Sequence, residues 1–279
     1  MSAVLPRICS FLLMLFLGSH TAFADPPPLK LGVMPFNSPQ ALARSLQGLT
    51  THLEQQLGRK IILYTAPNYK THIQQLLAGE FDIAITGPHF AAMAEEQSMR
   101  ILFRYAEKLE PVLVLPANSP PLQVAQLRGK TIATASRFAI ITLGSLEWLE
   151  KNGLELGKDY TLQEYPSHGA AIAAVANHMA DAAFVAASAL QQNPEEIKQA
   201  VRTQEIGIFL PHVCTLLNRT LDPASAERIT QALSDFPHTE AGKAFFQQTG
   251  YAGYAPLSAA DRVQLRRYIG LTKHLLELP

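Results

Sequence analysis

The triplet Ser136-Arg137-Phe138 stands between a predicted strand at Lys130–Thr134 and a predicted helix at Ile140–Lys151. At such a turn the first N–H groups of the helix are free, and the positive end of its dipole faces outward. An oxyanion bound there gains about 0.3–1 kcal/mol from the dipole, or up to about 2 kcal/mol when partly buried. The guanidinium of Arg137 can add a planar, two-pronged hydrogen bond. We therefore predict an anion-binding turn here, the alternative being a solvated arginine on a surface loop.

A second strand-to-helix turn carries Ser167 and His168, directly before a predicted helix at Ala170–His178. Ser167 is the residue type of a helix N-cap, because its hydroxyl can accept a hydrogen bond from the first helical turn. The imidazole of His168 can donate to an anion, and its charge can change near neutral pH. A single histidine is more often structural or exposed, so the residue type alone leaves both interpretations open.

Thr86 and Gly87 follow a predicted buried strand at Phe81–Ile85. Glycine permits a ligand to approach the backbone closely, although an ordinary strand-to-helix turn is the commoner explanation. Phe36 and Tyr69 are aromatic candidates for the wall of a cleft, because their loops follow strands on the same side of the predicted sheet. Taken singly, each of these aromatic side chains is more typical of the core.

The sequence offers little for catalysis or metal binding. It has no Gly-x-Ser-x-Gly elbow, no phosphate-cradling P-loop and no His-Glu-x-x-His pair. His212 and Cys214 would share one face of a strand, but no compact set of further ligands accompanies them. We interpret Cys214 as a small buried side chain. We expect neither an enzyme nor a protein that needs a cofactor or a metal.

Composition excludes some classes of partner and leaves others open. The chain has 279 residues, of which 48% are hydrophobic, with 23 basic and 23 acidic side chains. Zero net charge argues against a general nucleic-acid binder, which would carry a basic excess. A local site on a neutral protein can still attract a small anion. The length allows one large domain or two of ordinary size.

Residues 1–24 have the pattern of a secretory signal peptide. Arg7 precedes the apolar run 11–17, and the triplet 22–24 has the small-x-small form of a cleavage site. A membrane anchor is the alternative, but the apolar run is too short to cross a bilayer comfortably. We expect cleavage after Ala24 and an exported, soluble mature protein.

Predicted strands and helices alternate along the rest of the chain, which is typical of βαβ units. The predicted strands are Leu29–Val33, Lys60–Tyr64, Phe81–Ile85, Ile101–Tyr105, Val112–Leu115, Lys130–Thr134, Tyr160–Glu164, Ala182–Ala186 and Ile206–Leu210. The predicted helices are Pro39–Leu57, Tyr69–Leu77, His89–Glu96, Ile140–Lys151, Ala170–His178, Ala224–Leu233, Thr239–Gln248 and Ala259–Leu276. Because the alternation restarts after residue 121, we predict an α/β protein of two lobes, each a mainly parallel sheet flanked by helices. The helical tail should pack on the first lobe, and the ligand should bind in the cleft between the lobes, at the carboxyl ends of the strands.

Short motifs follow one another in a fixed order along the chain. They are Gly32-Val33-Met34-Pro35-Phe36, Asn68-Tyr69, Ala78-Gly79-Glu80-Phe81-Asp82-Ile83-Ala84, Gly87-Pro88, Leu127-Arg128-Gly129-Lys130-Thr131-Ile132-Ala133, and Ser167-His168 followed by Ala180-Asp181-Ala182-Ala183. In this order they resemble the phosphate/phosphite/phosphonate-type (PhnD-like) substrate-binding proteins of ABC transporters, over nearly all of residues 29–260. The resemblance implies a periplasmic binding protein of type II topology. Lobe one would comprise residues 25–110 plus 212–279, and lobe two residues 111–211.

The resemblance also implies a site. His168 stands where the family has a ligand-contacting histidine. One departure lies at residues 134–142, which read Thr-Ala-Ser-Arg-Phe-Ala-Ile-Ile-Thr, because phosphonate-binding members usually carry a hydroxyl-rich Ser-Thr-Ser-Gly-like stretch at this helix start. The predicted ligand-binding residues are Phe36, Tyr69, Thr86, Gly87, Ser136, Arg137, Phe138, Ser167 and His168.

The function implied by the resemblance is capture of a small anionic ligand, phosphonate- or phosphate-like or an organic anion, and its delivery to an ABC permease. An alternative is a periplasmic subunit that senses its ligand and signals to a membrane kinase or cyclase. An enzyme built on the same fold is a third, weaker hypothesis. We expect a monomer with no nucleic-acid partner.

Overall fold

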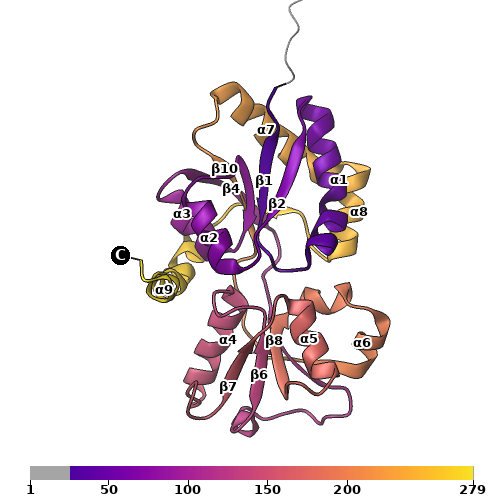
Figure 1. Cartoon of the computed structure of the whole chain (residues 1–279), viewed down its shortest axis with the longest axis vertical. Helices are drawn as coiled ribbons and strands as arrows, with labels where there is room; N and C mark the ends of the chain where they lie inside the picture. The colour runs from indigo at the N-terminus through magenta and orange to yellow at the C-terminus, as the bar shows by residue number, and fades with distance from the viewer. Residues whose placement is uncertain (1–25, 279) are drawn as a thin grey trace, which may run out of the picture.

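The computed structural model describes residues 26–278, so the predicted signal peptide lies outside the described residues. The chain forms two α/β lobes that follow one another along its longest axis, each built on its own sheet (Figure 1). Two crossover segments, residues 106–110 and 206–213, connect the lobes. Leu109 and Leu210 exchange backbone hydrogen bonds of 2.8 and 2.9 Å, which hold the two crossovers side by side.

The first lobe contains a six-stranded sheet of order β11-β4-β10-β3-β1-β2. Its strands are β1 (Leu29–Val33), β2 (Ile61–Thr65), β3 (Ile83–Thr86), β4 (Met99–Tyr105), β10 (Cys214–Asn218) and β11 (Tyr254–Ala255). Gly32 in β1 is required by packing, because a Cβ atom there would lie 2.3 Å from the ring of Phe81. Cys214 in β10 is fully buried, as the sequence predicts.

The second lobe contains a five-stranded sheet of order β7-β6-β8-β5-β9. Its strands are β5 (Pro111–Pro116), β6 (Thr131–Thr134), β7 (Thr161–Glu164), β8 (Ala182–Ala186) and β9 (Val201–Glu205). Strand β8 lies at the centre and is buried along its whole length, which suits its run of small and apolar side chains.

Helices cover both sheets, and several of them begin after a residue whose side chain caps the first turn. The α-helices are α1 (Pro39–Leu57), α2 (Tyr69–Leu77), α3 (Pro88–Glu95), α4 (Ile140–Lys151), α5 (His168–Ala176), α6 (Glu195–Ala200), α7 (Pro223–Asp235), α8 (Glu240–Thr249) and α9 (Ala259–Leu276). Short 3₁₀ helices are η1 (Val124–Leu127), η2 (Ala187–Gln192) and η3 (Phe236–His238). The side chains of Ser38, Asn68 and Ser167 accept the capping N–H of α1, α2 and α5.

The predicted α/β class is confirmed with one correction, because both sheets are mixed rather than mainly parallel. Strand β1 pairs in parallel with β2 and β3, and β6 pairs in parallel with β7 and β8. Strands β5 and β10 run antiparallel to their neighbours. Each of these two strands enters its lobe from a crossover, and therefore from the cleft side, opposite to the direction of the βαβ strands.

The predicted strand at Ile206–Leu210 is wrong. The strand lies one segment earlier, in β9 at Val201–Glu205, and residues 206–210 cross from one lobe to the other. Strand β9 is an edge strand in which the four residues after Val201 are all polar and partly or fully exposed, so its apolar signal is weak. Gly207 adopts a positive φ of 70°, which turns the chain away from the sheet.

The helical tail packs on both lobes rather than on the first alone. Helices α7 and α8 contact α1 of the first lobe, whereas α9 contacts α3 of the first lobe and α4 of the second. Arg262 pairs with Glu95 on α3, and Arg267 pairs with Glu147 on α4. Helix α9 is therefore a third connection between the lobes, in addition to the two crossovers (Figure 1).

Candidate functional site

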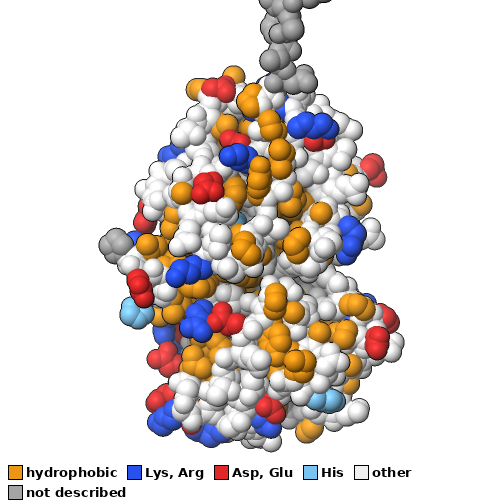
Figure 2. Space-filling view, viewed as in Figure 1, with side chains coloured by type: hydrophobic (Ala, Val, Ile, Leu, Met, Phe, Trp, Pro, Cys, Tyr) orange, Lys and Arg blue, Asp and Glu red, His pale blue; other side chains and the backbone are white. Residues whose placement is uncertain are grey.

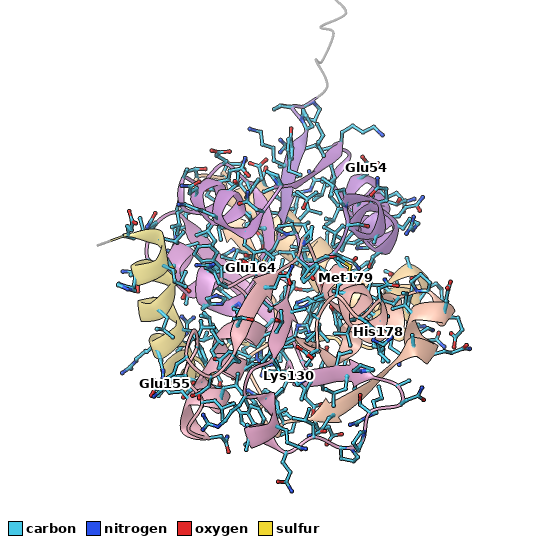
Figure 3. All side chains as sticks on the ribbon, turned by 60° about the horizontal axis from the view of Figure 1, so that its bottom comes forward. Glu54, Lys130, Glu155, Glu164, His178 and Met179 are labelled. Atoms are coloured by element: carbon cyan, nitrogen blue, oxygen red, sulfur yellow. The ribbon has the colours of Figure 1, made fainter. Side chains whose placement is uncertain are left out.

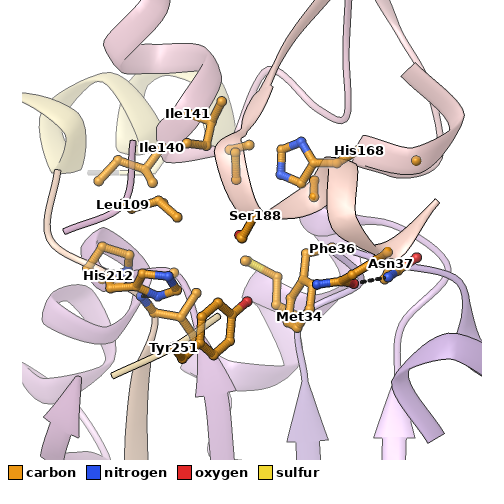
Figure 4. Close-up of a pocket in the computed structure, with 18 of the residues that line it drawn as sticks. Met34, Phe36, Asn37, Leu109, Ile140, Ile141, His168, Ser188, His212 and Tyr251 are labelled. Atoms are coloured by element: carbon orange, nitrogen blue, oxygen red, sulfur yellow. Dashed lines mark hydrogen bonds between the residues drawn. The ribbon is translucent and has the colours of Figure 1, made fainter. Parts of the chain in front are cut away.

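A pocket of about 80 Å³ lies between the lobes, with room for several water molecules or one small organic ion. It is lined from both lobes by Met34, Phe36, Asn37, Tyr69, Gly87, Pro88, Leu109, Ala139, Ile140, Ile141, His168, Gly169, Ala186, Ser188, Ala189, Gln192, Asn193, His212, Val213 and Tyr251. Figure 4 shows this lining, and Figure 2 shows the waist that the molecule has between its lobes. The predicted location of the site between the lobes is therefore matched by a cavity.

Two buried polar atoms at this pocket have no hydrogen-bond partner in the protein. They are the hydroxyl of Tyr69, at the first residue of α2, and Nδ1 of His168, at the first residue of α5. Tyr69 is 3% exposed and His168 is 8% exposed. Buried polar atoms are normally hydrogen-bonded, so each of the two is a candidate partner for a ligand. Because they come from different lobes, one ligand could contact both.

The starts of α4 and α5 both lie at the pocket, and each offers free backbone N–H groups. The first intrahelical bonds are donated by Leu143 in α4 and by Ala171 in α5. The preceding N–H groups of Ile140, Ile141 and Gly169 therefore have no partner within their helices. No side chain caps α4, and Ser167 caps only the third position of α5. This end of the pocket suits an anion.

None of the lining residues, all of them within the described range, is Asp, Glu, Lys or Arg. Burial lowers the pKa of His168 to about 4, so its imidazole is neutral near pH 7. Burial also lowers the pKa of His212 to about 3, with a smaller contribution from the charge of Arg104. Burial raises the pKa of Tyr69, whose hydroxyl stays protonated. The donors that face the pocket are consequently neutral.

The opposite end of the pocket lies at the crossovers. His212 Nδ1 accepts the N–H of Val213 at 2.8 Å, so its proton resides on Nε2, which lies 3.6 Å from Glu107 Oε1. Burial and then the charge of Glu107 raise the pKa of Tyr251 to about 12, while the nearby Ser188 hydroxyl acts in the opposite direction. Figure 4 shows His212, Tyr251 and Ser188 around this end. The pocket thus has an electropositive end at the helix starts and a carboxylate behind its other end.

Four of the nine predicted ligand-binding residues line the pocket: Phe36, Tyr69, Gly87 and His168. Two others lie directly behind the lining and serve local structure. The Thr86 hydroxyl is bonded to His72 Nε2 at 2.9 Å, and the Ser167 hydroxyl caps α5. These two hold the shape of the pocket wall rather than form its surface.

The turn between β6 and α4 is arranged differently from the prediction. Arg137 points away from the pocket, with its side chain 57% exposed, and its Nε donates to Glu164 Oε1 at 2.5 Å. The backbone N–H of Arg137 also donates to Glu164 Oε2 at 2.9 Å. Glu164 ends β7 at the cleft end of the second sheet, opposite to Lys130 at its other end (Figure 3). The Ser136 hydroxyl accepts the N–H of Phe138 within the turn.

Phe138 connects the lobes instead of lining the pocket. Its side chain packs against a hydrophobic cluster of the first lobe that includes Met34 and Phe90. Its carbonyl oxygen is 2.9 Å from Nε2 of His89 on α3, a fully buried ring. Since a carbonyl only accepts, His89 carries its proton on Nε2. The departure from the hydroxyl-rich pattern therefore places an apolar contact between the lobes.

A second contact between the lobes lies at the edge of the pocket. Asn37, from the loop after β1, donates through Nδ2 to Oε1 of Gln192 at the end of η2, at 2.5 Å. Figure 4 marks this bond. Both residues line the pocket, and Asn37 is half-buried whereas Gln192 is exposed, so the bond lies at the rim of the pocket.

Sequence reasoning missed the lining residues Ser188, Gln192, Asn193 and Tyr251, and it considered His212 only as a metal ligand. Tyr251 comes from the loop between α8 and β11, and Ser188 from η2. These segments carry no motif, and only the topology brings them to one cavity. The apolar wall formed by Ile140 and Ile141 was visible in the sequence, because apolar residues replace hydroxyl-bearing ones at the start of α4.

Within residues 26–278, no three His, Cys, Asp or Glu side chains gather in a way that could hold a metal ion. In the same range, no helix combines the length and the apolar character that crossing a membrane requires. The polar side chains at the pocket are amides, hydroxyls and imidazoles. They can bind an anion by hydrogen bonds, and the rest of the wall can hold an apolar group.

The sequence of residues 31–262 matches the family described as the periplasmic phosphonate substrate-binding protein of ABC transporters. The chain belongs to this family. The match spans both lobes and all the segments that line the pocket. The protein is therefore a phosphonate-type substrate-binding component of an ABC transporter, which implies a membrane permease as its partner. Members of such a family bind a solute and do not transform it.

Solved structures of other binding proteins share the fold. One is a binding protein component of an ABC phosphonate transporter from Pseudomonas aeruginosa, with a TM-score of 0.77 and 17% identity over 91% of this chain and 88% of that chain. Another is PhnD1 from Prochlorococcus marinus in complex with methylphosphonate, with a TM-score of 0.77 and 15% identity over 91% of this chain and 99% of that chain. The alkanesulfonate-binding protein SsuA from Xanthomonas axonopodis pv. citri, bound to MOPS, has a TM-score of 0.62 and 22% identity over 91% of this chain and 95% of that chain.

Proposed function

We propose that the interlobe pocket captures a small phosphonate-like oxyanion that carries an uncharged, apolar substituent. The observation that carries this proposal is the pair of unpartnered buried atoms, Tyr69 OH and His168 Nδ1, on residues that line one cavity from different lobes. A ligand with several acceptor oxygens would satisfy both side chains, as well as the free N–H groups at the starts of α4 and α5.

The remainder of the lining supports the nature of the substituent. Met34, Phe36, Leu109, Ile140 and Val213 give the wall an apolar character, and no charged side chain faces the cavity. An ammonium group on the ligand would therefore find no carboxylate in the lining. A methyl or short alkyl group would instead replace water against these side chains, at roughly 25 cal/mol per Å² of apolar surface removed from water.

Contacts from both lobes provide the mechanism of capture. Tyr69 belongs to the first lobe and His168 to the second, so a ligand that binds both stabilises the closed arrangement over an open one. The shift equals the difference between its affinities for the two arrangements. The closed form would then dock on the permease and release the ligand there.

The remaining parts of this proposal concern the whole chain. Export would follow cleavage after Ala24. The lobes would comprise residues 25–110 plus 212–279 and residues 111–211, a division that the two separate sheets support. The protein would act as a monomer. Mass spectrometry of the periplasmic protein tests the cleavage, because it should find Asp25 as the first residue.

Isothermal titration calorimetry of residues 25–279, stripped of co-purified ligand, tests the site with methylphosphonate as the probe. Tyr69→Phe and His168→Ala should each weaken binding roughly ten- to a hundredfold, the effect of losing a hydrogen bond to a charged ligand. Tyr64→Phe and His274→Ala are matched controls, because both residues are exposed and neither lines the pocket. Equal affinities for all four variants would contradict the proposed site.

A further inference from the structure

We propose that Tyr251 limits the length of the substituent that the ligand can carry, so that its ring makes the pocket specific for the shortest alkylphosphonates. This limit acts at the site proposed above and rests on that proposed function. Two features of the structure support it: the unlike ends of the pocket, which orient the ligand, and the packing that holds the ring of Tyr251 in place.

The two ends of the pocket orient the ligand. Helices α2, α3, α4 and α5 all begin at the lining, and helix starts attract negative charge. The unpartnered atoms of Tyr69 and His168 lie at two of these starts. The carboxylate of Glu107 stands behind the opposite end, at the crossovers, where it would repel an oxyanion. The phosphonate oxygens should therefore lie at the helix starts, and the alkyl group should point toward the crossovers.

The crossover end of the pocket is lined by Leu109, His212, Val213 and Tyr251. Leu109 and Val213 are buried aliphatic side chains. His212 directs Nδ1 to the N–H of Val213 and Nε2 toward Glu107, so both of its ring nitrogens face the protein. Tyr251 is the largest of the four side chains, and Figure 4 shows it extending from this end toward the middle of the cavity. An alkyl chain that lengthens toward the crossovers would meet this ring.

Aromatic side chains pack against the ring of Tyr251. Its centroid lies 4.4 Å from that of Tyr105, 4.6 Å from that of His212 and 6.2 Å from that of Phe245. Tyr105 and Phe245 belong to the buried core of the first lobe, and neither lines the pocket, so they stand behind the ring. A close-packed core resists displacement, because shifted side chains must leave their preferred rotamers. The ring should therefore not withdraw to make room for a longer ligand.

Hydrogen bonds also hold the loop that carries Tyr251. Glu107 of the first crossover accepts the N–H of Ala252. The N–H of Ala106 donates to the carbonyl oxygen of Gly253 at 2.9 Å. Strand β11 follows directly and pairs with β4 of the first sheet. These bonds tie the loop to the crossover and to the sheet, so the position of the ring is set by the fold.

Isothermal titration calorimetry with methyl-, ethyl-, propyl- and butylphosphonate measures the limit. The affinity of the wild type should fall at least about tenfold between methyl- and propylphosphonate, because additional methylenes overfill a packed cavity. In Tyr251→Ala the affinity should instead rise about fourfold with each added methylene until the vacated space is filled. Tyr251→Leu leaves a smaller space, so its preferred chain should be longer than that of the wild type and shorter than that of Tyr251→Ala.

Two matched variants separate the ring from other causes. Tyr251→Phe keeps the ring and removes the hydroxyl, so its preference for chain length should equal that of the wild type. Tyr254→Ala removes a ring that also packs on Tyr105, at 5.8 Å, but does not line the pocket, so it should keep the same preference. A changed preference in Tyr251→Phe would assign the limit to the hydroxyl, and one in Tyr254→Ala would assign it to loosening of the aromatic cluster. Either result would overturn the inference.

The wild-type series tests the inference even without a variant. Affinity that stays constant or rises from methyl- to butylphosphonate would overturn it, because the chain would then leave the pocket by another route. A fall with chain length that persists unchanged in folded Tyr251→Ala or Tyr251→Leu would also overturn it. Absence of binding of all four phosphonates by the wild type would contradict the proposed function itself.

Discussion

Two turns of the second lobe look equivalent in sequence and differ in the structure. Each follows a strand of the same parallel pair, β6 or β7, and each leads into a helix whose start reaches the pocket. The turn before α5 directs His168 into the cavity. The turn before α4 directs Arg137 outward to Glu164 and Phe138 into the first lobe. From the α4 turn and the start of its helix, only Ala139, Ile140 and Ile141 line the pocket.

The two turns show that the position of a turn in the fold and the directions of its side chains have separate causes. Position follows from the strand-helix alternation. Direction follows from partners distant in sequence: Glu164 lies beside this turn because β7 pairs with β6 through Thr134 and Glu164, and Phe138 meets residues of the other lobe. Neither partner is visible from the turn itself.

The largest expected effect is on stability at low pH, and it involves both turns. His89, bonded to the α4 turn, and His168 both have a pKa lowered to about 4 by burial. Between that value and the ordinary 6.5, the unfolded chain binds more protons than the folded one. The free energy of unfolding should therefore fall as the pH falls through this window, by up to about 1.4 kcal/mol per pH unit for each histidine.

Urea unfolding at about pH 7, 5.5 and 4.5 measures this effect. A His89→Gln variant should show a smaller pH slope than the wild type, because His89 no longer titrates, whereas the other buried histidines with a lowered pKa, His72, His168 and His212, still do. Identical slopes in the two proteins would contradict the assignment of His89 as a buried neutral ring. Added methylphosphonate should raise the free energy of unfolding of the His89→Gln variant as it does that of the wild type, because the variant keeps His168 at the pocket.

The second expected effect separates the turns by ligand affinity. His168→Ala should weaken methylphosphonate binding at least tenfold, as argued above, whereas Arg137→Ala should change it less than about twofold because the guanidinium faces solvent and Glu164. Calorimetry on both variants at one pH measures the contrast. A large loss of methylphosphonate affinity in Arg137→Ala would show that the arginine turns into the pocket when ligand binds, and would contradict the difference between the two turns.

The third expected effect concerns contact between the lobes. Phe138→Ala removes the apolar side chain that the α4 turn places against the first lobe. Because Phe138 is only partly buried, the free energy of unfolding should fall by about 1–2 kcal/mol, less than for a fully buried phenylalanine. Small-angle X-ray scattering of the ligand-free variant should give a larger radius of gyration than the wild type, since closure without ligand loses this contact. Phe209→Ala, at an exposed phenylalanine of the crossover, is the matched control and should leave the radius unchanged.

The smallest expected effect is that of Glu164→Gln. It removes the charge that holds Arg137, in an ion pair whose side chains are 57% and 34% exposed. Such pairs contribute about 0–1 kcal/mol, so the free energy of unfolding should fall by less than about 1 kcal/mol. Thermal unfolding and calorimetry should both resemble the wild type. A marked gain in affinity would mean that Glu164 keeps Arg137 away from the ligand.

Much of the fold could be predicted from the sequence, because strands and helices leave local signals. The caps Ser167 and Asn68 and the glycines at helix ends mark boundaries that the structure reproduces within a few residues. The predicted strand at 206–210 is wrong, because β9 is polar at every position after Val201 and the apolar residues that follow it belong to the crossover. Within the site, His168 and Tyr69 could be predicted to lie at the cavity, because they begin helices on the cleft side.

The crossover end of the pocket could not be predicted in the same way. Ser188, His212 and Tyr251 come from three segments far apart in sequence, which are the 3₁₀ helix η2 after β8, the second crossover and the loop after α8. Their proximity depends on how the two lobes meet. That arrangement is fixed by α9 and by the paired crossovers, whose contacts are long-range.

Cys214 has a practical consequence for following this protein in solution. It is the free cysteine of residues 26–278, it is fully buried, and burial raises its thiol pKa, so little thiolate is present to react. Two cysteines introduced at exposed positions outside the pocket lining, one on each lobe, such as Lys60 and Lys158, could therefore carry a pair of fluorophores with little background labelling. Energy transfer between the dyes would then report each opening and closing of single molecules, and would turn the protein into a reagentless sensor for its ligand.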